Sequence, residues 1–238
     1  MDVDRGTPTR SPGRRTRLRL SDEVADYVRE QIILGQIRAG EYVRPEKIAE
    51  ELELSATPAR EGLLSLQAEG FLRVVPRRGF VAEGVSASDV QDIFVGQGLL
   101  AGELAARATD RLTDRELTDL AELQAKIESA AKQDDLATVR DLNDRFHRAI
   151  YRAADSPRLL RLLQATLGYA PRLLWTTVEK WPDLTVHDHR AVLDALRERD
   201  PAAARATMQE HLVKAGAVLA DRLRAAAAAA GEQRTDGR

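Results

Sequence analysis

Apolar residues recur at steps of three and four through most of the chain, which is the spacing of one face of an α-helix. The first such stripe consists of Leu20, Val24, Tyr27, Val28, Ile32 and Ile33. Ser21 is expected to cap this helix, and Gly35 is expected to end it. The chain therefore begins, after a short arm, with a helix.

The pattern changes several times before residue 84. Pro45 opens a second, short helix, and a tight connection at 54–58 precedes a third helix that stops at Gly70. Ser55 or Thr57 is expected to cap this third helix, with Leu63, Leu64 and Leu66 facing inward. Residues 71–75 then read as a strand, 76–79 as a hairpin turn and 80–82 as the return strand. Helix, helix, tight turn, helix and hairpin is the order of a winged helix-turn-helix.

From residue 88 onward the pattern is helical. Six helices are expected, at about 88–109, 113–132, 135–154, 157–180, 183–199 and 201–227. Thr113 and Glu116 have the spacing of a capping box. Six helices with short connections favour an antiparallel bundle, so the predicted fold class is mainly α: a winged helix-turn-helix with three helices and a β-hairpin, followed by an all-α helical bundle.

The composition excludes several classes of protein. The chain has no cysteine, so it can form neither a disulfide framework nor a thiolate metal site. No apolar run approaches the roughly 20 residues that a membrane-spanning helix needs, and no signal peptide is visible. We therefore expect a soluble, cytoplasmic protein with no membrane partner.

Charge is unevenly distributed along the chain, although the net charge is only −2. Residues 1–20 carry a net charge of +4, and residues 21–84 carry −4. The arginines of the second segment gather at Arg60, Arg73, Arg77 and Arg78, where a winged helix-turn-helix contacts DNA. The acidic balance weakly favours a different interpretation, a helical interaction module that does not bind DNA.

Three of the four histidines fall on the apolar faces of three different predicted helices. They are His147, His189 and His211, and Asn143 lies one turn before the first of them. His187 falls on the opposite face from His189. One histidine on an apolar face is most often an ordinary core residue, but three of them with an amide can share a metal ion. We therefore predict a divalent metal site with Asn143, His147, His189 and His211 as ligands.

Residues 18–83 closely resemble the DNA-binding domain of the GntR family of bacterial transcription regulators. The matching motifs are Ile-Leu-Gly-Gln-Ile, Ile-Ala-Glu-Glu-Leu, Ser-x-Thr-Pro-x-Arg-Glu, and Glu-Gly-Phe leading into Arg-Gly-Phe-Val. With the basic hairpin, the resemblance implies that the residues contacting DNA are Arg44, Ser55, Thr57, Arg60, Arg77, Arg78 and Gly79. The family usually has arginine at the position of Ala56, and its loss could remove about 1–3 kcal/mol of base discrimination.

Residues after 88 resemble the ligand-binding domain of the FadR subfamily of GntR regulators. The matching motifs are Asn143-x-x-Phe146-His147-x-x-Ile150-Tyr151, Ser156-Pro157-Arg158-Leu159, His189-Arg190-x-Val192-Leu193, and Met208-x-x-His211-Leu212. In metal-binding members of this subfamily, an Asp or Asn and three histidines hold a divalent cation. All four positions are filled here. This ligand set suits Zn²⁺ first, with Ni²⁺, Co²⁺ or Mn²⁺ as alternatives.

Two departures from the subfamily concern charge. Asn143 stands where relatives carry aspartate, so a bound metal ion would keep its full positive charge. We therefore expect the protein to hold the metal more weakly, and the bound metal to attract an anionic effector more strongly. The first bundle helix commonly carries Arg-x-x-Leu-Glu, whose arginine clamps a carboxylate, but here Gln97 replaces that arginine. The effector, expected to be a small organic or sugar acid, would then be held by the metal alone or by another arginine such as Arg148 or Arg172, or it would not be a simple carboxylate. Gln97 could instead simply pack or face solvent.

The leading hypothesis is a homodimeric transcription regulator, by resemblance a repressor, whose helical domain binds a metal and a metabolite. Its partner would be a pseudo-palindromic double-stranded DNA operator, because one recognition helix reads only a few base pairs. The corresponding parts are a basic disordered arm (1–17), a DNA-binding domain (18–84), an effector-binding and dimerisation domain (88–228), and a disordered tail (229–238). The alternative is a metal-dependent enzyme using the three histidines, but no additional acid–base residue stands beside them.

Overall fold

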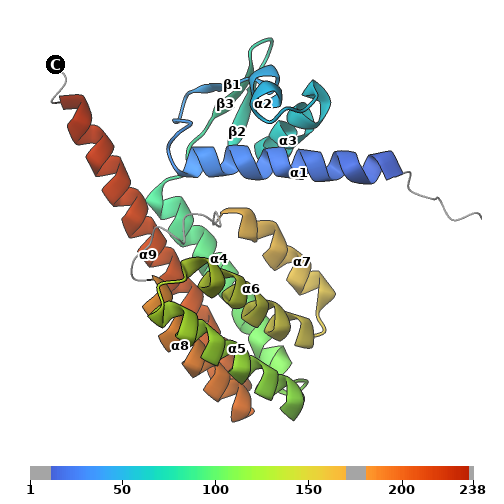
Figure 1. Ribbon diagram of the computed structural model, residues 1–238, viewed down its shortest axis with the longest axis vertical. Helices are drawn as coiled ribbons and strands as arrows, with labels where there is room; N and C mark the ends of the chain where they lie inside the picture. Colours follow the sequence, from blue (N-terminus) through green and yellow to red (C-terminus); the bar gives the residue numbers. More distant parts are fainter. Residues whose placement is uncertain (1–11, 170–180, 236–238) are drawn as a thin grey trace, which may run out of the picture. The chain divides into compact units, whose positions relative to one another are not determined.

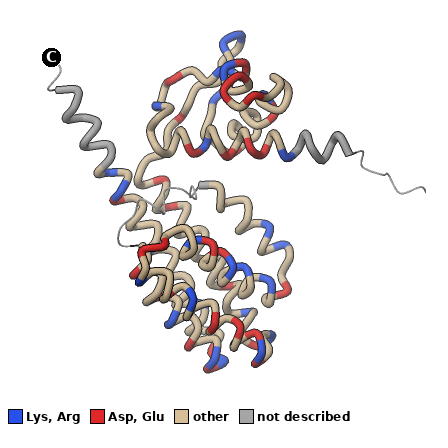
Figure 2. The backbone as a smooth tube through the Cα atoms, in the orientation of Figure 1, with Lys and Arg blue, Asp and Glu red and all other residues tan. Residues whose placement is uncertain are grey.

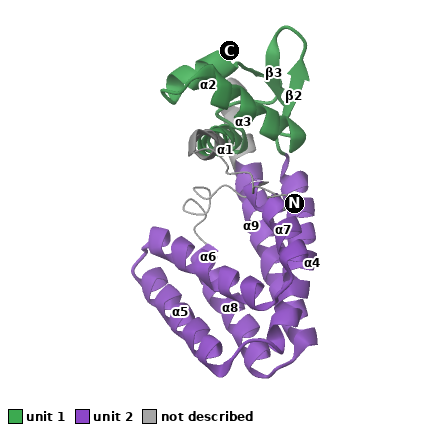
Figure 3. Ribbon diagram, turned by 90° about the vertical axis from the view of Figure 1, so that its right-hand side faces the viewer, with its two compact units in different colours: residues 1–85 green, residues 86–238 purple. Residues whose placement is uncertain are grey.

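The computed structural model describes residues 12–169 and 181–235. The chain divides into two compact units, residues 1–85 and 86–238 (Figure 3). Among the described residues, the first unit combines helices with a small sheet, and the second is entirely helical (Figure 1). The predicted fold class, a winged helix-turn-helix followed by an antiparallel helical bundle, is confirmed.

The first unit has the element order expected of a winged helix-turn-helix. Its helices are α1 (Pro12–Ile33), α2 (Pro45–Glu51) and α3 (Ala56–Ala68), and its strands are β1 (Tyr42–Val43), β2 (Leu72–Val75) and β3 (Gly79–Ala82). The strands form one antiparallel sheet in the order β1-β3-β2. The sequence did not predict β1, because two residues are too few to show the alternation of a strand.

The first helix starts earlier than its capping pattern predicts. α1 begins at Pro12, and Ser21 lies buried inside the helix, so its predicted role as N-cap is wrong. The predicted disordered arm over 1–17 is therefore also wrong for residues 12–17, while residues 1–11 lie outside the described part. The physical reason is that residues 14–33 contain neither glycine nor proline and are rich in arginine, which favours helix.

α1 and α3 pack closely because a glycine lies between them. A Cβ added to Gly62 of α3 would lie 2.6 Å from the backbone oxygen of Ser21. Leu63 and Leu66 are completely buried in this interface, whereas Leu64 is 44% exposed, so its predicted inward position is wrong. Successive helical residues differ by about 100° around the axis, which places Leu64 beside the inward stripe rather than on it.

The second unit is a bundle of antiparallel helices. Its elements are α4 (Ala87–Thr109), α5 (Asp114–Lys132), α6 (Leu136–Ala153), α7 (Pro157–Thr166), the 3₁₀ helix η1 (Leu167–Tyr169), α8 (Trp181–Arg197) and α9 (Pro201–Thr235). The predicted capping box is confirmed: the Thr113 hydroxyl accepts from the Glu116 backbone N–H, and the Glu116 carboxylate accepts from the Thr113 N–H. None of the helices in the described ranges is long and apolar enough to cross a membrane.

Two of the predicted helix ends are wrong. The helix expected over 157–180 ends at Thr166 and tightens into η1, which contains Gly168, a poor helix former; residues 170–180 lie outside the described part. α9 continues to Thr235, so the tail predicted at 229–238 is helical as far as residue 235. Alanine has the highest helix propensity, and the alanine run at 225–230 therefore extends α9.

Glycines let α4 and α9 approach each other at several levels. Gly98 and Gly102 of α4 face the backbone of α9, where a Cβ on Gly102 would lie 2.7 Å from the Arg205 oxygen. In the other direction, a Cβ on Gly216 of α9 would lie 2.4 Å from Cβ of Phe94. These distances are too short for any larger residue, so the two helices are held at a fixed, close separation.

We predict that Gly102→Ala destabilises the helical unit by about 1–3 kcal/mol, because the new methyl group meets backbone rather than a movable side chain. Gly96→Ala is the matched control in the same helix, since a Cβ there meets nothing within 4 Å. It should be neutral or stabilising by up to about 1 kcal/mol. Thermal and denaturant unfolding measure both changes, and equal stabilities of the two variants would contradict this account of the interface.

Candidate metal centre and DNA-binding surface

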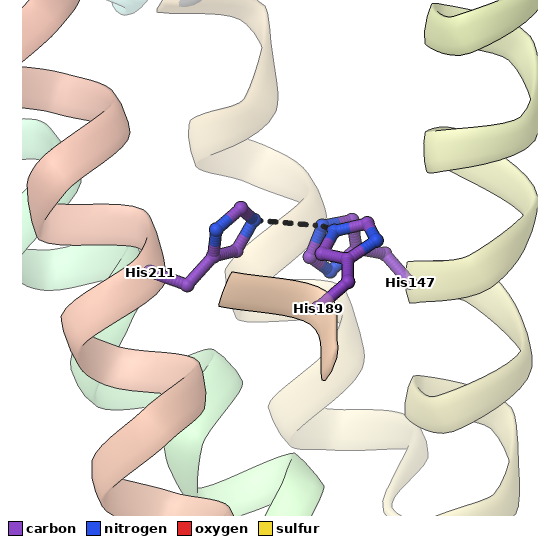
Figure 4. A group of neighbouring side chains, drawn as sticks. All are labelled: His147, His189 and His211. Carbon is purple, nitrogen blue, oxygen red and sulfur yellow. Dashed lines mark hydrogen bonds between the residues drawn. The ribbon is translucent and has the colours of Figure 1, made fainter. Parts of the chain in front are cut away.

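Three helices bring His147, His189 and His211 to one point inside the bundle. The histidines come from α6, α8 and α9, and their ligating atoms all lie within 4.8 Å of one another (Figure 4). Nε2 of His147 is 3.2 Å from Nε2 of His189 and 3.2 Å from Nε2 of His211. Two nitrogens bound to one tetrahedral Zn²⁺ at roughly 2.0–2.1 Å would lie about 3.3 Å apart. His187 is exposed on the other side of α8, as predicted.

Burial keeps two of these imidazoles in the neutral form. The pKa of His147 and of His189 is held well below its usual value, mainly by burial and further by repulsion from His211. His189 is completely buried, and its ring stacks on Phe146 with the ring centres 4.2 Å apart. Neutral imidazoles have a free lone pair on one ring nitrogen, which is the form that binds metals.

Tyr151 contacts Nδ1 of His147. Its hydroxyl donates to Sδ of Met208 at 3.8 Å, and its oxygen lies 3.1 Å from Nδ1 of His147. Burial raises the pKa of Tyr151 well above its usual value, so the phenol stays protonated. With the hydroxyl proton directed to Met208, the oxygen can accept a proton from Nδ1 of His147, and the Nε2 lone pair would then face the other two histidines.

Asp188 contacts the outer side of His211. Its Oδ2 is 3.5 Å from Nδ1 of His211, its Oδ1 is 3.3 Å from Nζ of Lys214, and only 5% of its side chain is exposed. Burial alone would raise the pKa of Asp188, but His211 and Lys214 outweigh it and lower the pKa below the usual value. Asp188 is therefore ionised at neutral pH. Sequence reasoning missed both Tyr151 and Asp188 as parts of the site.

Asn143 is available as a fourth ligand. It lies one turn before His147 on α6, and its Oδ1 is buried without a hydrogen-bond partner in the described ranges. Nδ1 of His189 is likewise buried and has no such partner there. An unpaired buried amide oxygen one helical turn from His147 has the chemistry to join three imidazole nitrogens around a divalent cation of borderline character.

Two of the three residues predicted to hold an effector lie in the described ranges. Gln97 is buried, and its amide donates to the backbone oxygen of Thr166 at 2.8 Å, so it joins α4 to the end of α7. Arg148 is exposed on α6, on a different face from His147. Arg172 lies outside the described residues. Gln97 thus makes a packing contact, and its contact with an effector stays a prediction.

The predicted DNA-contacting residues at the start of α3 are exposed. Ser55 is the N-cap by its backbone conformation, but its hydroxyl makes no capping hydrogen bond. Thr57 and Arg60 are exposed in the first turns of the helix, and Arg44 is exposed directly before α2. Hydroxyls and guanidinium groups at a helix N-terminus have the chemistry and position to contact phosphates and base edges.

The hairpin between β2 and β3 carries a basic tip. Arg77 and Arg78 are exposed there, where Figure 2 shows positive charge at the end of the hairpin. Arg77 has a φ of +63° and Gly79 a φ of +96°, and a Cβ on Gly79 would lie 3.3 Å from the Val43 oxygen. Glycine is therefore required at this turn, both for its backbone conformation and for the close approach of β1.

Comparison with known proteins agrees with both units. Residues 20–81 match the family described as bacterial regulatory proteins, gntR family, and residues 92–214 match the FCD domain. The HTH-type transcriptional regulator McbR of Escherichia coli (strain K12) is 26% identical over 212 residues, which cover 87% of this chain and 96% of that protein. The HTH-type transcriptional repressor GlaR of the same organism is 28% identical over 199 residues, covering 79% and 90%.

A solved structure, of Escherichia coli McbR/YncC, superposes with a TM-score of 0.64 at 25% identity, covering 85% of this chain and 98% of that one. These relatives are transcription regulators, so the alternative of a metal-dependent enzyme finds no support. The chain belongs to the GntR family of bacterial regulatory proteins, with an FCD domain as its helical unit, and is a DNA-binding transcription regulator.

Proposed function

We propose that the chain is a repressor whose helical unit binds a divalent metal ion and a small anionic metabolite, which together alter its affinity for a DNA operator. The observation that carries this proposal is the convergence of three histidines from α6, α8 and α9 inside the domain expected to bind the effector, with Nε2 of His147 3.2 Å from Nε2 of each of the other two. The description of GlaR, a relative, as a transcriptional repressor supports the proposal that this chain represses transcription.

The metal would be held by His147, His189, His211 and Asn143. Three imidazole nitrogens and an amide oxygen favour Zn²⁺, with Ni²⁺, Co²⁺ or Mn²⁺ as alternatives. When bound, the ion supplies a buried positive charge with open positions for an oxygen ligand of the effector. The residues around it exclude water and fix the ring orientations: Phe146 stacks on His189, and Tyr151 contacts His147.

The effector would be an organic or sugar acid held chiefly at the metal. A carboxylate is the ligand that an ion surrounded by neutral groups attracts most strongly. The position at which relatives carry a clamping arginine is Gln97, whose amide already bonds to the Thr166 oxygen. Arg148 is exposed. Neither residue supplies a charge to the three-histidine cluster, which supports a larger role for the metal than for an arginine.

The functional form would be a homodimer bound to a pseudo-palindromic operator. One α3 helix reads only a few base pairs, and a two-fold pair doubles the number that is read. Leu99 of α4 and Leu162 of α7 are 58% and 60% exposed. Large exposed apolar side chains support a dimer in which the second copy covers them. Metal and effector would favour one arrangement of the helical units and so change the spacing of the two DNA-binding units.

We expect metal-stripped wild-type protein to bind one Zn²⁺ per chain and to gain roughly 2.7 kcal/mol of stability at free zinc 100-fold above Kd. His189→Ala should abolish both effects, because it removes a central ligand. His187→Ala, on the exposed side of the same helix, should leave them unchanged. Isothermal titration calorimetry and thermal unfolding make the comparison, and equal behaviour of the two variants would reject the site.

Arg60→Ala should weaken binding to the DNA upstream of the chain's own gene about 10- to 100-fold, since one arginine–base contact contributes about 1–3 kcal/mol. Arg115→Ala removes the same charge from an exposed position of the helical unit and serves as the control. Electrophoretic mobility shifts at fixed salt measure both. A loss of the same size in the two variants would mean that only net charge matters.

A panel of small carboxylic and sugar acids should contain members that change DNA affinity 5- to 150-fold in the presence of Zn²⁺, the usual range of allosteric coupling. The effect should disappear in His189→Ala and persist in His187→Ala. Fluorescence anisotropy of labelled operator DNA gives the coupling directly. An effect that survives removal of the metal would point to an arginine clamp instead.

A further inference from the structure

We propose that Asp188 is a positioning residue for the metal site: it orients His211 and supplies, from behind the ligands, the negative charge that the ligand set lacks. This inference rests on the proposed metal-binding function. It concerns a residue that contacts a predicted ligand and is not itself a member of the predicted ligand set.

The geometry places the His211 ring between the carboxylate and the centre of the cluster. Nδ1 of His211 is 3.5 Å from Oδ2 of Asp188, while Nε2 of the same ring is 3.2 Å from Nε2 of His147. Within the described ranges, neither Nδ1 of His211 nor Oδ2 of Asp188 has a hydrogen-bond partner. The carboxylate oxygen is thus placed to accept a proton from Nδ1 once the two atoms approach by a few tenths of an ångström, and the Nε2 lone pair would then be left for the ion.

The charge of Asp188 matters because the ligands themselves are neutral. Asn143 brings an amide where a carboxylate would cancel one positive charge, and the three histidines bind as neutral imidazoles. A divalent ion buried among neutral groups is costly without a nearby counter-charge. Within residues 12–169 and 181–235, Asp188 is the one carboxylate that forms an ion-pair contact with a histidine of the cluster.

Lys214 holds the other carboxylate oxygen without removing this charge. Its Nζ is 3.3 Å from Oδ1 of Asp188 and 2.9 Å from Oε1 of Glu210, one turn away on α9. The lysine charge is thus shared between two carboxylates. Asp188, with 5% of its side chain exposed, is fixed at one oxygen and presents the other to His211.

A purely structural role for Asp188 makes a different prediction. If its purpose were only to join α8 to α9 through Lys214, then Asp188→Asn and Lys214→Met would lower stability alike. The metal affinity of the folded protein would then be unchanged in both. The affinity for Zn²⁺ alone, measured on full-length protein that is confirmed to be folded, distinguishes the two roles.

The experiment compares Zn²⁺ affinities of metal-stripped full-length variants by competition with a chelator at pH 7.5. Asp188→Asn should bind Zn²⁺ 10- to 100-fold more weakly than wild type, the usual effect of losing such a partner. Lys214→Met should stay within about three-fold of wild type. Asp194→Asn, a change of the same kind at an exposed position of α8, is the matched control and should have no effect.

The double variant Asn143→Asp/Asp188→Asn tests the charge argument separately. Returning a carboxylate to the ligand set should recover at least ten-fold of the lost affinity, because the counter-charge is again present. If the double variant stays as weak as Asp188→Asn, the role of Asp188 as counter-charge is overturned. Circular dichroism confirms that each variant is folded before its affinity is compared.

Nitrogen NMR of the histidine rings in wild-type protein provides a second test that needs no variant. The zinc-loaded protein should show His211 protonated at Nδ1 and bound through Nε2.

Two results would overturn the role of Asp188 alone: binding of the metal through Nδ1 of His211, or a Zn²⁺ affinity of folded Asp188→Asn within two-fold of wild type. Failure of wild type to bind Zn²⁺, Co²⁺ or Ni²⁺ would instead reject the metal site of the proposed function, and this inference with it.

Discussion

The close packing of α4 against α9 sets the dimensions of the helical unit. Gly98, Gly102 and Gly216 remove the side chains that would otherwise keep the two backbones apart. α9 carries His211, and α8 packs along α9, so a change in this separation would shift two of the three histidines. Imidazole nitrogens that must meet within a few tenths of an ångström need this rigid support.

A carboxylate ligand would both position a metal ion and supply negative charge, whereas different residues would serve these two roles around the three-histidine cluster. In the proposed site, neutral nitrogen and amide ligands would define the position of an ion, and Asp188, behind His211, would provide the charge. Tyr151 has the corresponding position behind His147 but brings no charge.

The sequence predicted the parts of the site that periodicity can reveal. His147, His189 and His211 each continue an apolar stripe, so their convergence follows from helix geometry. Asp188 also lies on the inward stripe of α8, four residues before Val192, but a single acidic residue on a stripe indicates no partner, and its contact with His211 depends on tertiary packing. Gln97 shows a similar limit: sequence shows that a charge is missing, but its bond to the end of α7 depends on tertiary packing. The beginning of α1 and strand β1 were missed for local reasons, a misleading serine and a two-residue strand.

The pairing of β1 with β3 has a consequence for engineering. Val43 pairs with Phe80, and Arg44 follows directly at the start of α2, so the hairpin and the basic residue before α2 belong to one hydrogen-bonded piece. Transplanting only the hairpin of another regulator would break this pairing and misalign its arginines. A chimaera designed to change the operator preference should therefore exchange Tyr42–Val43 and residues 72–82 together, although the two segments are distant in sequence.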